Sequence, residues 1–239
     1  MKQSIHSDSA RGLLANASWR CLAGAHAHYS RSHGTARRYA HGFAPVAAFA
    51  DPTRPDLPSL AVLSEPGETL ALPGVSAASH PAWRPVASVR FAQMVRWTSR
   101  ARPVHGFTMR RLSDADLPAL QALVEAAGIR MFGPSMLMVG EHFGITEGGR
   151  LVAVAATRTV VGGFREIGTV CTHPDHRGRG LASSLVQEVA ASIEARGEVP
   201  FLHTEAEKKH LAALYMRCGF EPLQEVPMLV VQRTAGAAA

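Results

Sequence analysis

The chain has few cysteines, few aromatic residues and no long uninterrupted apolar segment. Its three cysteines, Cys21, Cys171 and Cys218, are odd in number and widely spaced. That spacing argues against a disulfide framework or a Cys-x-x-Cys zinc site and favours a reducing compartment. No apolar run reaches the roughly 18 residues of a membrane-spanning helix, and no apolar segment follows Lys2 as it would in a secretory signal. The sequence therefore predicts a cytoplasmic protein without membrane association.

Charged residues are also scarce, at 18%, whereas 46% of the 239 residues are hydrophobic. This balance is typical of a globular chain with one large or two small domains. The net charge of +6 is uneven, because residues 1–104 carry +7 and residues 105–239 carry −1. The basic half either meets an anion such as nucleic acid or is an ordinary solvated surface. Within residues 1–104, the only adjacent basic residues are Arg37 and Arg38. No aromatic pattern typical of RNA binding accompanies the basic residues there, which favours the solvated surface.

One segment carries most of the chemical information. Between Glu166 and Ala182 the chain reads EIGTVCTHPDHRGRGLA, and a helical pattern follows at once. A strand that runs through a Gly/Arg turn into a helix can hold a phosphate, because glycines let backbone N–H groups approach an anion closely. The start of the helix adds unpaired N–H donors and a partial positive charge. The segment lacks the order of a dinucleotide fingerprint or of a P-loop.

Two motifs resemble those of the GNAT N-acetyltransferase superfamily. The order Arg-x-x-Gly-x-Ala at 177–182 resembles its acyl-CoA pyrophosphate loop, R/Q-x-x-G-x-G/A. Downstream, ALYMRCGF at 213–220 resembles its second signature, A-L-Y-x-x-x-G-F. The resemblance covers residues 106–231 and implies direct acetyl transfer from acetyl-CoA to an amine in a ternary complex, without a metal.

The expected fold class is α/β, with a mixed central sheet of the GNAT type in residues 105–235. The pattern there predicts the order β-α-β-β-β-α-β-α-β, with the second helix weak or missing between Gly128 and Glu141. Residues 1–104 are predicted to form a smaller α+β accessory domain, resembling the degenerate half of some bacterial tandem GNAT-like proteins. Its expected elements are a helix over 12–30 interrupted by Gly24, a helix over 58–64, a strand over 69–72, and a hairpin of 86–89 with 92–97.

The resemblance assigns acetyl-CoA contacts to the end of one strand and to the loop after it. The strand backbone would pair with the pantetheine arm, and an N–H there would polarise the thioester oxygen. Cys171 is interpreted as a packing or pantetheine-lining residue, because transfer in this superfamily is usually direct. The expected acetyl-CoA contacts are Val170, Cys171, Thr172, Arg177, Gly178, Arg179, Gly180, Leu181 and Ala182.

Glu166 is the first catalytic candidate, because it opens an otherwise apolar strand. Alternation predicts that Glu166, Gly168, Val170 and Thr172 share one face. By resemblance to histone-type GNAT enzymes it is a general base, and burial among apolar neighbours would raise its pKa. The alternative is a strand-end carboxylate in solvent or paired with Arg165 or Arg158, and both interpretations stay open.

Tyr215 is the second catalytic candidate. It matches the tyrosine that many GNAT enzymes place near the CoA sulfur, where it would protonate the departing thiolate. The alternative is an aromatic residue that anchors its helix to the sheet. The sequence departs from the family near Lys208, where many relatives have an asparagine that touches the CoA arm.

No metal site is predicted. His26, His28 and His33 are expected in one helical region, and His173 and His176 flank a turn, without metal-binding spacing. The leading hypothesis is an N-acetyltransferase for a small-molecule or peptide amine. The alternatives are a catalytically silent CoA-binding regulatory module and a basic nucleic-acid-binding protein. The acceptor would meet the variable segment 130–142, whose Met131, Phe132, Met136 and Met138 form an apolar wall.

Overall fold

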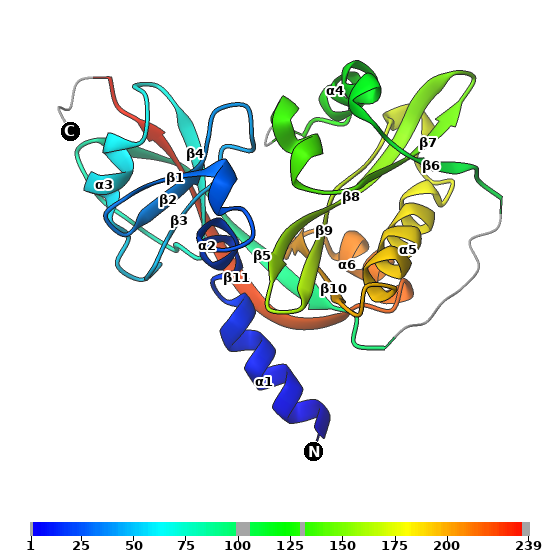
Figure 1. The fold of residues 1–239 in the computed structure, drawn as a ribbon, viewed down its shortest axis with the longest axis horizontal. Coiled ribbons are helices and arrows are strands. Elements are labelled where there is room, and N and C mark those ends of the chain that lie inside the picture. The colour runs from blue at the N-terminus through cyan, green and yellow to red at the C-terminus, as the bar shows by residue number, and fades with distance from the viewer. Residues whose placement is uncertain (1, 99–105, 130–131, 236–239) are drawn as a thin grey trace. The chain divides into compact units, whose positions relative to one another are not determined.

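The computed structural model describes residues 2–98, 106–129 and 132–235 of the chain (Figure 1). The eleven strands of this described part form two sheets. Three make a small antiparallel sheet in the order β1-β2-β3, and eight make a large mixed sheet in the order β4-β11-β5-β10-β9-β8-β7-β6. The chain divides into two compact units, which are described separately. Unit 1 comprises residues 1–92, 205–207 and 223–239, and unit 2 comprises residues 93–204 and 208–222.

Unit 1 contains the small sheet and several helices. Its buried core combines Phe49, Leu60 and Trp83 with Leu229 and Val231 from the last strand. Strand β4 pairs with that last strand antiparallel, from Pro73 opposite Met228 to Thr69 opposite Gln232. The elements of unit 1 are α1 (Lys2–Leu14), α2 (Ala17–Ala23), β1 (Ser30–His33), β2 (Ala36–Tyr39), β3 (Ala47–Phe49), α3 (Leu57–Val62), β4 (Thr69–Pro73), and most of β5 (Trp83–Val95) and β11 (Glu221–Arg233).

Unit 2 contains the strands that lead to both motifs. Strands β6, β7, β8 and β9 are successively antiparallel, whereas β10 runs parallel to β9. A parallel neighbour requires a crossover, and α5 supplies it between β9 and β10. The elements of unit 2 are β6 (Met109–Arg111), α4 (Leu117–Ala126), β7 (His142–Glu147), β8 (Arg150–Val161), β9 (Phe164–Thr172), α5 (Leu181–Glu194), β10 (Val199–Glu205) and α6 (Lys209–Arg217).

The two faces of this sheet have separate cores. On one face Leu120 and Leu123 of α4 pack with Val154 of β8 and Cys171 of β9. On the other face Leu185 and Val189 of α5 belong to a larger cluster with Ala153, Ala155 and Ile167. Along β8, Ala153, Val154 and Ala155 therefore alternate between the two cores, as the pleat of a strand requires. The helices α4 and α5 lie on opposite sides of β8 and β9 (Figure 1).

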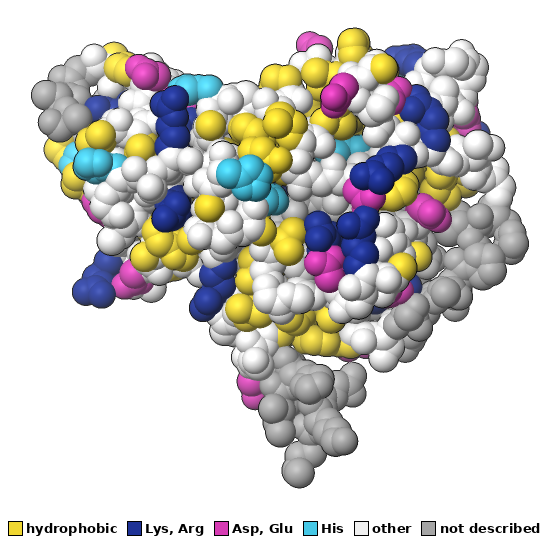
Figure 2. Space-filling view, viewed as in Figure 1, with side chains coloured by type: hydrophobic (Ala, Val, Ile, Leu, Met, Phe, Trp, Pro, Cys, Tyr) yellow, Lys and Arg dark blue, Asp and Glu magenta, His cyan; other side chains and the backbone are white. Residues whose placement is uncertain are grey.

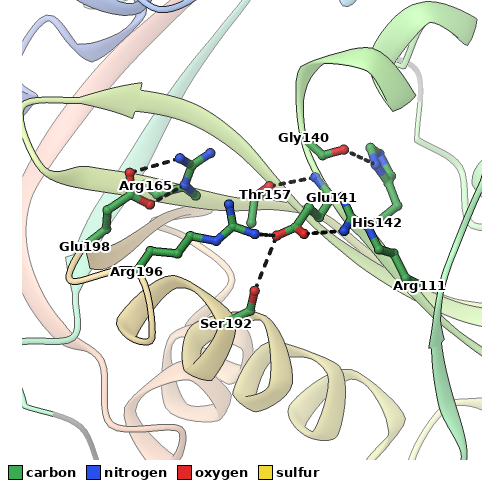
Figure 3. A network of polar contacts seen from close by, with 9 residues as sticks. All are labelled: Arg111, Gly140, Glu141, His142, Thr157, Arg165, Ser192, Arg196 and Glu198. Carbon is green, nitrogen blue, oxygen red and sulfur yellow. Dashed lines mark hydrogen bonds and ion pairs between the residues drawn. The ribbon is translucent and has the colours of Figure 1, made fainter.

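A polar network fastens the end of α5 to the far edge of the sheet (Figure 3). The carboxylate of Glu141 accepts from Arg111 at 2.9 Å, from Ser192 at 3.3 Å and from Arg196. Its backbone N–H donates to the Thr157 hydroxyl at 2.9 Å. Gly140 makes this approach possible, because a Cβ there would lie 2.0 Å from the Thr157 carbonyl oxygen. The network holds α5 in place, and with it the loop that precedes the helix.

The predicted α/β fold and its GNAT-type element order are confirmed in residues 106–235, and the three-stranded sheet precedes the large one. The second helix of that order is reduced to a 3₁₀ helix at Pro134–Val139. The predicted hairpin of 86–89 with 92–97 is wrong, since one continuous strand, β5, occupies that stretch. The helical region expected for the histidines is wrong for His33, which lies in β1, whereas His28 lies in a short 3₁₀ helix, Ala27–Tyr29. The domain boundary at 104 lies outside the described residues and stays a prediction.

Candidate active site

Glu166 lies in β9 opposite an irregularity of β8. The β8–β9 register moves from Thr157 opposite Ile167 to Val160 opposite Arg165, so Arg158 and Thr159 both face Glu166. Such a bulge turns extra side chains toward one residue of the partner strand. Gly168 leaves room for the longer of the two side chains, because a Cβ there would lie 2.5 Å from Cδ of Arg158. Local strand irregularity thus directs a cation and a hydroxyl to the same carboxylate.

The Glu166 carboxylate is buried, and both of its oxygens accept hydrogen bonds. Its side chain is 5% exposed, and Oε2 accepts from the hydroxyl of Thr159. Oε1 lies 3.5 Å from the Arg158 guanidinium and 2.9 Å from Nδ1 of His203 on β10. Of the two partners offered by the sequence, Arg158 is therefore the one found, while Arg165 pairs with Glu198 at 2.5 Å (Figure 3).

The expected rise in the pKa of Glu166 is not what the structure supports. Burial by itself would raise this pKa, but the charge of Arg158 and the hydrogen bonds from His203 and Thr159 outweigh burial. Together they hold the pKa of the Glu166 carboxyl well below its usual range. The expectation was wrong because the strand's apolar neighbours in sequence are not its neighbours in space. An ionised carboxylate with occupied lone pairs is a weak proton acceptor.

His203 was missed by the sequence reasoning. It interrupts the apolar strand Phe201–Thr204 in the same way that Glu166 interrupts its own strand, and that signal was available. Strands β9 and β10 pair in parallel from Phe164 opposite Val199 to Ile167 opposite Leu202, and His203 follows directly. Its Nε2 lies 2.9 Å from the amide nitrogen of Gln93 on β5. Glu166, His203 and Gln93 therefore form a continuous chain of hydrogen bonds across three strands.

A second bulge alters the C-terminal part of β9. The register moves from Ala156 opposite Gly168 to Val154 opposite Cys171, so Thr169 and Val170 both face Ala155. Thr169 has φ 51°, in the left-handed region that non-glycine residues rarely adopt. The inserted residue reverses the alternation, and the prediction that Val170 and Thr172 share the face of Glu166 is wrong.

The residues of this bulge and those after it have distinct environments. Cys171 packs in the α4 core, whereas Val170 packs against the α5 core. Burial raises the pKa of the Cys171 thiol to about 12, although Arg177 acts in the opposite direction. A thiol of this kind is not a nucleophile. The hydroxyl of Thr172 is buried and, among the described residues, has no hydrogen-bond partner, so the strand ends on an unsatisfied polar group.

The loop between β9 and α5 has an unusual backbone. Gly178 has φ 77° and Gly180, the residue that caps the helix, has φ 84°. Nothing in the described part of the chain lies within 4 Å of where a Cβ would be at either glycine. Among the residues that the structure describes, no side chain caps the N-terminus of α5. The first N–H groups of this helix, including those of Leu181 and Ala182, are therefore available to an anion.

Basic side chains flank this loop. Arg179 is exposed and forms two hydrogen bonds with Glu147, each 2.8 Å long. The hydrogen bond and charge of Arg179 lower the pKa of the Glu147 carboxyl, and His176 lies 3.6 Å from the same carboxylate. Arg177 donates to the Thr172 carbonyl at 3.3 Å. Both arginines predicted for this site therefore lie beside the N-terminus of α5.

Tyr215 lies on α6 in the same core as Leu181, the first residue of α5. Its side chain is buried, and its ring meets that of Phe220 edge to face, with centroids 6.3 Å apart. Burial raises the pKa of the Tyr215 phenol to about 12, with a smaller contribution from Cys218. The phenol therefore keeps its proton at neutral pH. Its packing also fits the anchoring role that was the alternative.

The segment expected to meet the acceptor is only partly described, and Met131 lies outside the described residues. Phe132 packs against the α4 core that contains Cys171. Met136 is buried, whereas Met138 is 60% exposed. The expected apolar wall therefore has one methionine in the core and one at the surface.

The remaining features that bear on function are membrane-spanning helices, metal-binding groups and the distribution of surface charge. Within the described ranges, no helix is long and apolar enough to cross a membrane, and no three His, Cys, Asp or Glu side chains are grouped so that they could hold a metal. On the face in Figure 2, basic side chains occur at several places, and some of them lie beside acidic ones.

Comparisons with known proteins point to one superfamily. Residues 142–227 match the model of the FR47-like protein family. A protein from Novosphingobium aromaticivorans, assigned to the GNAT acetyltransferases, is 28% identical, with 93% of this chain and 99% of that chain covered and a TM-score of 0.81. A GCN5-related N-acetyltransferase from Kribbella flavida is 18% identical, covering 93% and 95%, with a TM-score of 0.57, and it supports the fold alone. No curated protein sequence matches the chain significantly.

Proposed function

The chain belongs to the GNAT superfamily, and from this premise we propose that it transfers an acetyl group from acetyl-CoA to a primary amine. The observation that carries the proposal is Gly180, a glycine with left-handed φ at the N-terminus of α5, in the loop that follows β9, where no side chain of the described residues caps the helix. The acceptor amine is a small molecule or a peptide.

The loop and the end of β9 would hold the acyl donor. The N–H groups at 178–182 would bind the pyrophosphate, and Arg177 and Arg179 would add charge-assisted hydrogen bonds. The unpaired Thr172 hydroxyl supports a polar ligand along β9. By resemblance, the backbone of Val170, Cys171 and Thr172 would pair with the pantetheine arm and polarise the thioester carbonyl.

Tyr215 is the proposed general acid. A phenol whose pKa burial raises to about 12 stays protonated over the working range, so it can donate to the thiolate as the C–S bond breaks. Its proton would be restored from the amine nitrogen of the tetrahedral intermediate. Replacing it by phenylalanine should lower kcat by about a hundredfold and leave acetyl-CoA affinity unchanged. A kcat within about twofold of wild type would return Tyr215 to its packing role.

The direct test combines binding with turnover. Calorimetry measures the affinity of the protein for acetyl-CoA. The rate of free-thiol release with a panel of primary amines measures acetyl transfer. Binding together with amine-dependent thiol release supports the enzyme. Binding without thiol release from any amine would instead favour a regulatory module that binds CoA but does not catalyse.

A further inference from the structure

The arginine side chains of unit 2 differ in whether an acidic partner compensates their charge. A guanidinium that is already paired attracts a further anion weakly, because the carboxylate cancels much of its field. Arg150 and Arg177, both beside the start of α5, form no ion pair with a carboxylate of the described residues. Most other arginines of this unit do form one, namely Arg96, Arg110, Arg111, Arg158, Arg165, Arg179 and Arg196.

Consecutive residues hold these two guanidinium groups. Nε of Arg177 donates to the Thr172 carbonyl at 3.3 Å, and Nη2 of Arg150 lies 2.7 Å from Nε2 of His173. A guanidinium can only donate, so Nε2 accepts and the ring hydrogen is on Nδ1. There it faces the Asp175 carboxylate, 3.5 Å away, and the 2.7 Å contact takes precedence over the 3.3 Å approach of the Asp175 N–H to Nδ1. The imidazole is therefore neutral, and both cations are held by groups that leave their charge uncompensated.

The β7–β8 hairpin brings Arg150 to this position. Its turn at 148–149 has positive φ at both glycines, 56° and 78°, as a two-residue hairpin turn of this type requires. The turn sets Glu147 directly opposite Arg150. The two side chains have different partners, since Glu147 pairs with Arg179 and Arg150 contacts His173. The hairpin thus compensates one arginine of the loop and adds a second cation that is not compensated.

Arg150 is exposed, whereas the histidine that holds it is only 8% exposed. A buried partner restricts the long arginine side chain before any ligand arrives. Less conformational entropy is then lost when an anion binds. Only one N–H of Arg150 donates to His173, so its other N–H groups remain available to an anion from solvent.

We propose that Arg150 binds the 3′-phosphate of CoA and makes the protein selective for donors that carry this phosphate, with His173 as the positioning residue. This inference rests on the proposed use of acetyl-CoA. Besides its pyrophosphate, CoA has a third phosphate on the ribose. The loop N–H groups, Arg177 and Arg179 are assigned to the pyrophosphate, which leaves the neighbouring uncompensated cation for the third phosphate. A guanidinium suits such a group, because it can donate two parallel hydrogen bonds to phosphate oxygens.

The test compares two donors that differ in one phosphate. Acetyl-dephospho-CoA has a hydroxyl at the ribose 3′-position and otherwise equals acetyl-CoA. Calorimetry measures the affinity of the full chain for each donor, in the wild type, Arg150→Gln and Arg179→Gln. Arg179→Gln is the matched control, because it removes the same charge beside the same loop from a residue assigned to the pyrophosphate.

We expect the wild type to bind acetyl-CoA about tenfold more tightly than acetyl-dephospho-CoA. Arg150→Gln should reduce this ratio to less than about threefold by weakening acetyl-CoA alone, with an unchanged melting temperature because the side chain is exposed. Arg179→Gln should weaken both donors by the same factor and keep the ratio.

The positioning role of His173 is tested with the same ratio. His173→Phe removes the acceptor for Arg150 and should reduce the selectivity. In His173→Gln the amide oxygen can accept from Arg150, so most of the selectivity should remain. Equal selectivity in these two variants would overturn the positioning role.

Arg150→Gln weakening both donors equally, or leaving their ratio unchanged, would overturn the role of Arg150. A wild type that binds both donors equally would also overturn it, while the proposed acetyl transfer would stand. A wild type that binds neither donor would instead overturn the proposed function. The wild-type measurement alone therefore distinguishes the two failures.

Discussion

The charged groups near the two ends of β9 differ in exposure and in the origin of their contacts. At the C-terminal end, residues 177–180 are exposed, and their geometry comes from two glycines, the second of which directly precedes α5. At the N-terminal end, Glu166 is buried, and its partners come from β8 and β10. The first is a local structure, and the second exists only after the sheet has formed. Loss of a single residue should therefore affect binding at one end and stability at the other.

The largest effect is expected at the buried end. Glu166→Ala leaves Arg158 and His203 without their shared carboxylate, and breaking a buried ion pair costs about 3–5 kcal/mol. Because Arg158 is partly exposed, the lower end of that range applies. Urea unfolding measures the loss. Glu147→Ala, which removes the exposed partner of Arg179, is the control and should change stability little. Equal losses of unfolding free energy in Glu166→Ala and Glu147→Ala would contradict the expected difference between the buried and the exposed carboxylate.

The open end should lose binding instead. Gly180→Val places a Cβ and two methyl groups on a residue with φ 84°, where the proposed acetyl-CoA site needs a phosphate close to the backbone. Loss of one charge-assisted hydrogen bond of about 1.5–3 kcal/mol corresponds to roughly a 10- to 100-fold weaker affinity for acetyl-CoA. Calorimetry provides the measurement.

Gly197→Val is the matched control for this variant. Gly197 lies just after the other end of α5, with φ 72° and nothing within 4 Å of its Cβ position in the described structure. It carries the same backbone strain far along the helix from the loop. Similar weakening of acetyl-CoA binding in both variants would show that helix strain, not phosphate approach, is responsible.

Low pH should decrease the free energy of unfolding through protonation of Glu166. Glu166→Gln should remove this part of the pH dependence. The folded-state pKa of Glu166 lies below its ordinary value of 4.5, so its contribution to stability is present above that value and is lost as the pH falls toward the folded pKa. Each pH unit between the two values corresponds to about 1.4 kcal/mol. The wild type should therefore lose stability below pH 4.5 more steeply than Glu166→Gln, as measured by unfolding at a series of pH values. Parallel pH curves for the two proteins would contradict this.

The smallest effect is expected at the exposed ion pair of the loop. Glu147→Gln removes the negative charge and one of the two acceptor oxygens that hold Arg179, and it should strengthen acetyl-CoA binding by about two- to fivefold, the scale of an exposed pair. High salt should reduce the difference, because both groups are open to screening by ions. An unchanged affinity at low salt would mean that Arg179 does not reach the ligand.

The order of strands and helices after residue 106 could be predicted because it depends on local signals. Apolar periodicity located α4 and α5, and Gly197 marked the end of the latter. The hairpin predicted in place of β5 failed because hydrogen bonding to a neighbour on each side, β11 and β10, continues that strand from Trp83 to Val95. The loop at 177–182 was also predictable, since positive φ at Gly178 and Gly180 is a property of the residues themselves.

The sequence by itself thus determined the GNAT-type order, the loop at the start of α5 and the identity of Glu166 as an unusual strand residue. Only the tertiary structure decided what surrounds that carboxylate. Two bulges, at Arg158–Thr159 and at Thr169–Val170, change which side chains share a face, and neither has a signal in the alternation of a single strand. They direct a guanidinium and a hydroxyl to Glu166, and pairing with β10 adds His203. Because the charge and hydrogen bonds of those partners exceed the cost of burial, the pKa of Glu166 falls where apolar sequence neighbours alone would have raised it.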